Sequence, residues 1–264
     1  MDRLSVLDDT FVVLERDNLP MHIGSLLIFD GAPPEYSELV AHVASRLDRL
    51  PRYRQVIREV PLNLGRPTWQ DDTHFSLEYH VRHTAVPHPG GPEQLRALAG
   101  RLFSHRLDMQ RPLWEMWLIE GLADNQFAIL NKIHHAMVDG LSGTDVMEML
   151  LDESPDVQID EARQWKPQRP PSTVEVLSDA LIDTVRNPLG RLKHLAEDLG
   201  SPKDAMVNAA AAIVGTLRIG ETLAHTEDQL LGQPGPHRRW AWAEGDLAEV
   251  KRIKTEIGGT VNDV

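Results

Sequence analysis

Two adjacent histidines followed by Asp-Gly form the segment whose side chains are best suited to chemistry, residues 134–140, HHAMVDG. Imidazole has an ordinary pKa of about 6.5, so a neutral ring can accept a proton from an alcohol or a thiol near physiological pH. The chain contains no cysteine, which removes a thiol nucleophile. A neutral base needs no covalent intermediate when the acyl donor is already activated, as a thioester is. The segment therefore predicts acyl transfer.

Other interpretations of these residues stay open at this point. His134 fits a core histidine held by hydrogen bonds, which is the usual role of a buried imidazole. His, His and Asp are also metal ligands, but side chains of neighbouring strand residues diverge, and no third ligand is spaced to complete a tetrahedron. No metal site is therefore predicted. Asp139 before Gly140 fits a turn residue or a buried ion pair as well as a catalytic acid.

The residues around the motif predict the elements that position it. The apolar run at 126–133 has the length of a strand and would deliver the histidines to a sheet edge. Ser142 and Asp145 form a capping-box pattern before the apolar residues of 146–151, which predicts a helix. The motif is thus expected at a strand-loop-helix corner, where one histidine enters a cleft and the other packs behind it.

Strands and helices alternate through the first half of the chain, which predicts an α/β or α+β class with mixed sheets. The expected strands cover 21–29, 75–81 and 114–119, with the strand at 21–29 buried, and the expected helices cover 37–50, capped by Ser37, and 93–105.

The character of the sequence changes after Leu151. Residues 155–172 are rich in proline and charge, which predicts a surface crossover, and two apolar stretches at 173–199 and 206–217 follow. A new strand-helix pattern starts at Arg238. The predicted organisation is a first lobe at 1–152, a crossover linker with amphipathic helices at 153–236, and the start of a second lobe at 237–264.

Composition limits the classes of partner and compartment. The chain of 264 residues is 41% hydrophobic, enough for a sizeable core, and its formal net charge of −13 argues against nucleic-acid binding. No run reaches the ~18 apolar residues of a spanning helix, and the charged N-terminus does not resemble a signal peptide. The absence of cysteine makes the cytoplasm the expected compartment.

Eight ordered blocks of the sequence resemble the bacterial wax ester synthase/diacylglycerol acyltransferases. This family lies within the coenzyme A-dependent acyltransferases, together with chloramphenicol acetyltransferase and peptide-synthetase condensation domains. The blocks are Leu4-Ser5 with Asp8 and Phe11, then 21–24, 50–52, 66–69, 80–82, Leu107-Asp108 with 111–115, 134–140, and 260–264. The resemblance implies a two-lobed, chloramphenicol acetyltransferase-like fold with mixed sheets flanked by helices.

The resemblance also implies residue roles. His135 would face a tunnel between the lobes as the general base, His134 would support it, Asp139 would hold the loop by an ion pair, and Gly140 would allow the tight turn. Motifs associated with the integrity of this site match Pro112, Leu113, Trp114, Asn262 and Asp263.

The implied reaction moves a fatty acyl group from acyl-coenzyme A to diacylglycerol, giving triacylglycerol, or to a long-chain alcohol, giving a wax ester. Acyl-coenzyme A is a substrate here, and no cofactor is expected. Family members carry a complete second lobe after the Asn-Asp motif, so the second lobe is expected to be incomplete in this sequence and its remainder to pack against it, in the same gene product or on a separate chain.

Two alternatives to this function remain. One is an acyltransferase of the same superfamily that uses another hydroxyl acceptor, and the other is a non-catalytic lipid-binding homologue. The hydrophobic substrates and the apolar stretches at 173–199 and 206–217 also imply peripheral attachment to the inner membrane face or to lipid droplets.

Overall fold

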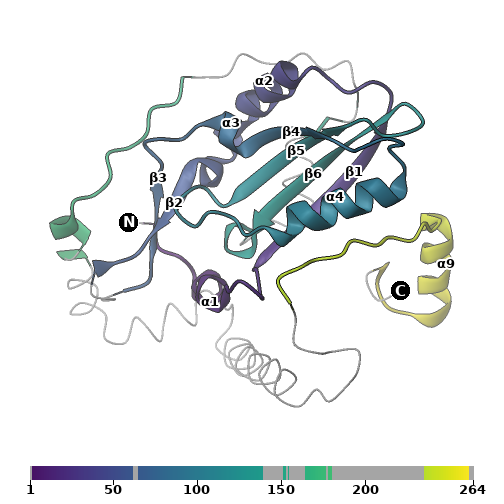
Figure 1. Cartoon of the computed structure of the whole chain (residues 1–264). Helices are drawn as coiled ribbons and strands as arrows, with labels where there is room; N and C mark the ends of the chain where they lie inside the picture. The colour runs from purple at the N-terminus through teal and green to yellow at the C-terminus, as the bar shows by residue number, and fades with distance from the viewer. Residues whose placement is uncertain are drawn as a thin grey trace.

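The structure is a computed structural model that describes residues 2–61, 65–138, 151–152, 154, 164–176, 178–179 and 235–261. Its centre is a four-stranded mixed sheet in the order β1-β6-β5-β4 (Figure 1). The strands are β1 (His22–Asp30), β4 (Val81–Ala85), β5 (Trp114–Glu120) and β6 (Gln126–His134). β6 runs antiparallel to both β1 and β5, and β4 runs parallel to β5.

The remaining elements cover or extend this sheet. A separate two-stranded sheet joins β2 (Gln55–Arg58) to β3 (Thr68–Asp71). The helices are α1 (Val6–Leu14), α2 (Tyr36–Arg46), α3 (Leu77–His80), α4 (Pro92–Ser104) and α9 (Leu247–Ile257), and the short 3-10 turns are η1 (Leu47–Arg49), η2 (Pro51–Arg54) and η4 (His135–Met137).

Alternation along β6 divides the core into two layers. Leu130 points toward α4 and packs with Leu98 and Leu102 of that helix. Ile129 and Ile133 point to the opposite face and join the larger cluster that includes residues of α2, η1 and η2. A strand buried on both faces reads as a nearly continuous apolar run, as β6 does.

Several expectations are confirmed by these elements. The strands predicted at 114–119 and 126–133 are β5 and β6, and the helix predicted at 93–105 is α4. The strand expected at 21–29 is β1, but it lies at an edge of the sheet and is only half-buried, with Ile28 45% exposed. β6 is an interior strand that lies between β1 and β5. The two histidines are at its carboxyl end and are therefore flanked by strands on both sides.

The prediction of a strand at 75–81 is wrong for most of that segment. Leu77–His80 form the single turn of α3, and the strand begins only at Val81. The turn brings Phe75 and His80 together, with ring centroids 5.2 Å apart, and five residues of extended chain would separate the same rings widely. Packing of these aromatic rings therefore overrides the local β pattern.

The helix predicted at 37–50 is α2 followed by η1, but Ser37 is not its cap. Glu35 occupies the N-cap, and its backbone amide donates to the Glu38 carboxylate. The carboxylate of Glu38 thus binds the amide of the N-cap residue, and Ser37 lies within the helix.

The segment 235–246 runs as extended chain toward α9 (Figure 1), so the strand expected from Arg238 is absent from this described part of the chain. Its Arg238 amide donates to the Ser104 hydroxyl at 2.8 Å, and Trp240 packs edge-on against Phe103. Side chains of α4 thus bind and pack against this segment, where a neighbouring strand would be expected to do so. A Cβ at Gly100 would lie 2.8 Å from the Arg238 carbonyl oxygen, so this close approach requires glycine.

The helix expected after Arg238 is α9. None of its residues is buried, and Ile257 is 71% exposed. The helix predicted at 146–151, most of 173–199 and all of 206–217 lie outside the described residues. The domain boundaries stay a prediction.

Candidate active site

His134 is buried at the end of β6 and makes one hydrogen bond with each ring nitrogen. Its Nδ1 accepts from the Ala136 backbone amide at 3.0 Å, and its Nε2 lies 2.7 Å from a carboxylate oxygen of Glu15. Since Nδ1 is an acceptor, the proton of the neutral ring is on Nε2 and is donated to Glu15. His134 is therefore a neutral ring of fixed tautomer that caps the η4 turn.

Glu15 follows the last residue of α1, and its side chain is only 1% exposed. Besides His134, it accepts hydrogen bonds from Arg106 Nε at 2.9 Å and from the Met21 amide at 3.2 Å. Burial alone would raise the pKa of this carboxyl, but the bonds from His134 and Arg106 outweigh it and hold the pKa at about 2. Glu15 is thus an anion.

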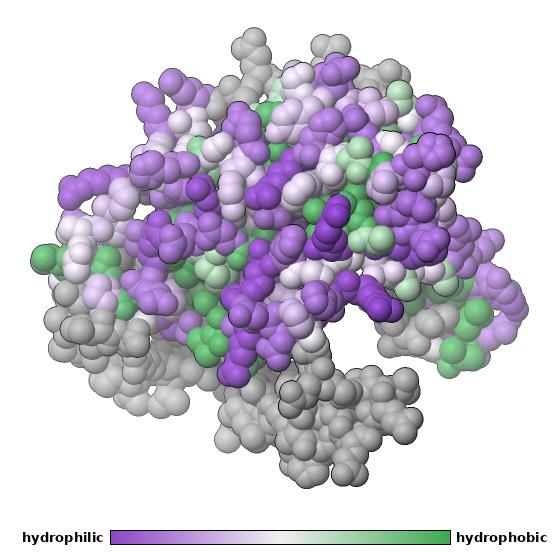
Figure 2. All heavy atoms as spheres, viewed as in Figure 1, coloured by the Kyte–Doolittle hydropathy of each residue, from purple (hydrophilic) through white to green (hydrophobic). Residues whose placement is uncertain are grey.

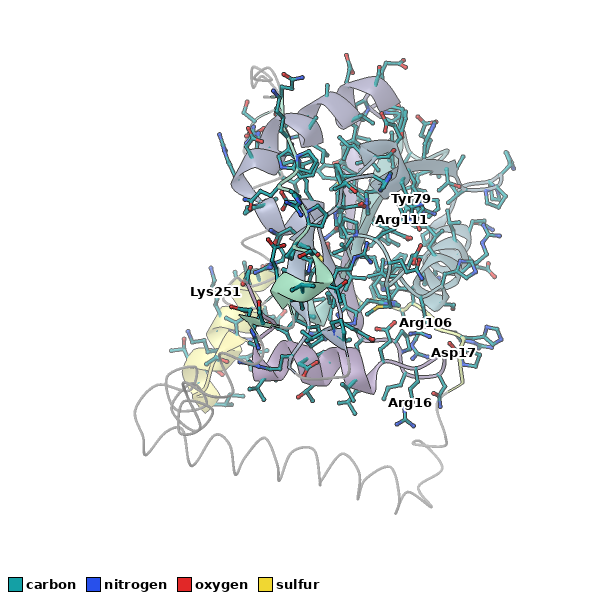
Figure 3. All side chains as sticks on the ribbon, turned by 90° about the vertical axis from the view of Figure 1, so that its left-hand side faces the viewer. Arg16, Asp17, Tyr79, Arg106, Arg111 and Lys251 are labelled. Carbon is teal, nitrogen blue, oxygen red and sulfur yellow. The ribbon has the colours of Figure 1, made fainter. Side chains whose placement is uncertain are left out.

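Arg106 bridges this buried carboxylate to the surface, where its Nη1 binds Asp17 at 2.7 Å. Figure 3 shows Arg106 and Asp17 close together near the end of α1.

His135 lies in η4, and its ring differs from that of His134. The backbone amide of His135 donates to the Met21 carbonyl at 2.9 Å, and its ring stacks on Phe11 of α1, with centroids 4.8 Å apart. The ring is half-buried, and no described residue forms a hydrogen bond with its nitrogens. Burial lowers the pKa of His135. The ring is therefore neutral at physiological pH and has a lone pair to offer.

The Pro112-Leu113-Trp114 segment holds the strand end that carries the histidines. The Leu113 carbonyl accepts from the His134 amide at 3.0 Å, and Leu113 and Trp114 are fully buried. The Trp114 indole donates to the Tyr53 carbonyl at 2.8 Å and stacks on His80, with centroids 4.7 Å apart. These contacts are with protein groups, which agrees with a role of the segment in site integrity.

Lys132 is a buried charge that sequence reasoning did not single out. Its Nζ donates to the carbonyls of Leu102, at 3.2 Å, and His105, at 2.8 Å, and lies 3.2 Å from the Glu115 carboxylate. The lysine thus places a cation at the carboxyl end of α4, where helix carbonyls lack partners. A lysine inside the mostly apolar run 126–133 was the available signal.

The structure brings five of the predicted site residues together: Pro112, Leu113, Trp114, His134 and His135. The other four lie outside the described residues: Asp139, Gly140, Asn262 and Asp263. Sequence reasoning missed the buried charges Glu15 and Lys132 and the surface residue Arg106 that pairs with Glu15. Within the described part of the chain, no group of three or more His, Cys, Asp or Glu is arranged to hold a metal ion.

A pH dependence of stability follows from His80, which is buried behind the site. Its Nδ1 donates to the Trp114 carbonyl at 2.8 Å. Burial lowers the pKa of His80 from 6.5 to about 4, against the opposing effects of that bond and of Glu115. In the unfolded chain the ring takes a proton below pH 6.5, and in the folded chain only near pH 4. The contribution of His80 to the free energy of unfolding is therefore complete above pH 6.5 and is lost as the pH falls toward 4. The loss amounts to at most about 3 kcal/mol.

Urea unfolding at pH 7, 5.5 and 4.5 tests this dependence. His80→Gln keeps a donor for the Trp114 carbonyl and should flatten the loss of stability with falling pH. A residual slope is expected from His22, whose pKa is likewise lowered to about 4, by burial and by Lys132. An unchanged slope in the variant would show that His80 is not the titrating group.

The sequence matches the family model described as wax ester synthase/diacylglycerol acyltransferase catalytic domain over residues 4–264. The chain belongs to this family. It is an acyltransferase domain, and its mixed α/β fold, with sheets flanked by helices, resembles that of a solved member of the family. The fold class and the family assignment from sequence are confirmed.

Relatives of two lengths match this acyltransferase domain. The chain is 34% identical over 261 residues to the probable diacylglycerol O-acyltransferase tgs3 of Mycobacterium tuberculosis, with 96% of this chain and 95% of the relative covered. It is 32% identical over 277 residues to the probable diacylglycerol O-acyltransferase tgs1 of the same species, of which it covers 55%.

Among solved structures, the wax ester synthase/diacylglycerol acyltransferase from Marinobacter aquaeolei VT8 matches with a TM-score of 0.50 and 33% identity, over 71% of this chain and 47% of that one. The acyltransferase domain therefore spans about half the length of tgs1 and of the Marinobacter enzyme, and nearly all of tgs3.

Proposed function

We propose that this protein transfers a fatty acyl group from acyl-coenzyme A to the hydroxyl of diacylglycerol or of a long-chain alcohol, with His135 as the general base. The observation that carries the proposal is the His135 ring itself. It is half-buried, its pKa is lowered by burial, and no described residue occupies its nitrogens. The names of the relatives supply the two acceptor classes.

The reaction proceeds through a direct attack. Neutral His135 takes the proton of the acceptor hydroxyl, and the oxygen forms a bond to the thioester carbonyl carbon. The C–S bond of the resulting tetrahedral intermediate then breaks, and the coenzyme A thiolate leaves. Its conjugate thiol has a pKa near ~8.5, so the sulfur is a good leaving group, and His135 returns the proton to it. Atoms and protons balance without a cofactor.

His134 and the Pro112-Leu113-Trp114 segment have supporting roles in this proposal. His134 caps the turn that carries His135, and Leu113 binds the backbone of His134. Asp139, Gly140, Asn262 and Asp263 are proposed as structural residues of the same site, on the family resemblance alone.

A direct assay tests the reaction. Labelled palmitoyl-coenzyme A is incubated with the full chain and either dioleoylglycerol or hexadecanol, and esters are separated by thin-layer chromatography. The expected result is ester formation with release of coenzyme A. Turnover only with another hydroxyl compound favours the related acyltransferase, and lipid binding without consumption of the thioester favours the non-catalytic homologue.

A second lobe is proposed to complete the site, on this chain or on another. The support is the Marinobacter enzyme, of which this chain covers only 47%. In the assay, addition of the corresponding second-lobe polypeptide should raise turnover. Equal turnover by residues 1–264 with and without that polypeptide would refute the two-lobed site.

Peripheral attachment to the cytoplasmic face of a membrane or to lipid droplets is also proposed, because the substrates partition into lipid. No helix in the described part of the chain is long and apolar enough to cross a bilayer. Figure 2 shows a mainly hydrophilic face with separate hydrophobic patches, one of them over α9, where Leu247 and Ile257 are exposed.

With a net charge of −13, attachment must rest on apolar insertion. We expect the protein to float with phosphatidylcholine vesicles containing triolein, and to do so equally in 0.1 M and 1 M NaCl. Loss of flotation in high salt, or none at either concentration, would contradict the proposal.

A further inference from the structure

We infer that Glu15 is a positioning residue for acyl transfer, which holds His134 so that His134 in turn fixes the turn carrying His135. The inference rests on the proposed function, because it assigns Glu15 a role in presenting the proposed base.

The first step of the argument is the continuous chain of contacts from α1 to η4. Glu15 accepts from His134 Nε2 at 2.7 Å, and His134 Nδ1 accepts from the Ala136 amide at 3.0 Å. The Ala136 amide is one of the donors at the start of η4 that the turn itself leaves without a partner. Glu15 therefore determines the ring orientation that satisfies this amide. A His134 ring that rotated away from Glu15 would leave the Ala136 amide unpaired in the interior.

The second step is the rigidity of the carboxylate. Glu15 is held by Arg106 Nε at 2.9 Å and by the Met21 amide at 3.2 Å, and its side chain is 1% exposed. The carbonyl of Met21 accepts from the His135 amide at 2.9 Å. Met21 thus binds Glu15 through its amide and His135 through its carbonyl, so the carboxylate and the proposed base share one backbone anchor.

The third step is that α1 contacts both histidines. Phe11, one helical turn before Glu15, stacks on the His135 ring with an interplanar angle of 20°. Residues spaced by four lie on one face of a helix, so Phe11 and the side chain at the helix end reach the motif together. Ser5 caps the start of α1 with Asp8, which fixes the register of the helix. The function of α1 in the site is to hold the pair of histidines from one side.

A double-mutant cycle on the full chain separates this role from general stabilisation. Glu15→Gln keeps the shape of the side chain but removes the charge, and Gln cannot accept from His134, Arg106 and Met21 together. We expect kcat to fall roughly 10- to 100-fold, in the range of an outer-shell partner, with the KM for palmitoyl-coenzyme A within about two-fold of wild type. In a His134→Ala background the same change should lower kcat by a clearly smaller factor, because the path through His134 is gone and only the anchor at Met21 still links Glu15 to His135.

Asp17→Asn is the matched control. Asp17 also pairs with Arg106 but is 90% exposed and does not contact His134 in the described contacts, so kcat should stay at the wild-type value. An equal loss from Glu15→Gln in the presence and absence of His134 would overturn the inference, and so would a wild-type kcat in the Glu15→Gln variant.

Glu15→Asp keeps the test decisive if Glu15→Gln does not fold. It retains the charge and the pair with Arg106 but withdraws the carboxylate by one methylene, and a displacement of about 1 Å can cost on the order of 100-fold in rate. A folded Glu15→Asp variant with wild-type kcat refutes positioning. If instead the wild-type chain forms no ester, the proposed function fails. The inference is then judged by the histidine NMR of the wild type, where it requires a proton on His134 Nε2 and none on Nδ1 at pH 7.

Discussion

Replacement of His135 with Ala is expected to lower kcat at least ~10²- to 10⁴-fold, the usual contribution of a general base, while the protein stays folded. The half-buried ring makes no hydrogen bond with a described residue, so within the described part of the chain its main loss is the stacking on Phe11. The melting temperature should change little. Initial rates with palmitoyl-coenzyme A and either acceptor, together with circular dichroism melts, give both quantities.

His134→Ala provides the comparison within the motif. The buried carboxylate of Glu15 would lose one donor but keep Arg106 and the Met21 amide, so a loss of stability and a milder loss of rate are expected. Full activity in His135→Ala would refute the mechanism. A loss in folded His134→Ala equal to that in His135→Ala would mean that the roles of the two rings are wrongly assigned.

Replacement of Trp114 with Ala is expected to destabilise the fold by about 3–5 kcal/mol, as for other large buried aromatic side chains. Trp114 is fully buried, stacks on His80 with ring centroids 4.7 Å apart, packs at a tilt against Tyr53 with centroids 4.9 Å apart, and donates to the Tyr53 carbonyl. The variant loses the packing of both rings and leaves that carbonyl without its donor. Urea unfolding measures the change in the free energy of unfolding.

Trp114→Phe separates packing from the hydrogen bond. Phe keeps an aromatic ring in the stack but has no donor, and a cost of about 1–3 kcal/mol is expected for the unpaired carbonyl together with the lost ring volume. If Trp114→Ala left stability unchanged and removed activity, Trp114 would contact substrate directly, and the structural interpretation of the Pro112-Leu113-Trp114 segment would be wrong.

Local patterns in the sequence predicted the elements next to the site. Apolar runs identified β5 and β6, and the helix predicted at 93–105 is α4, whose bounds agree with the prediction to within a residue at each end. These signals are short-range, since alternation and helical spacing need only a few residues to be read. The strand prediction at 75–81 failed because the local pattern was outweighed by the packing of His80 against Phe75 and against Trp114 of the distant strand β5.

No local sequence pattern could predict the environment of the two histidines. Adjacent residues at a strand end give no indication of which ring is buried, and the structure decides this through Glu15, which is 119 residues away from His134 in sequence. The same holds for Lys132, which binds carbonyls at the end of α4 27 and 30 residues earlier in the chain.

The sequence by itself determined the family, the strand that carries the motif and the candidate base, because residue types and their spacing are local properties of the chain. Only the tertiary structure decided that β6 lies inside the sheet, that His134 is a neutral donor to Glu15, and that α1 holds both histidines. Those properties depend on which distant segments pack together, and the free energy of that packing comes from burial and hydrogen bonds that are formed only in the folded chain.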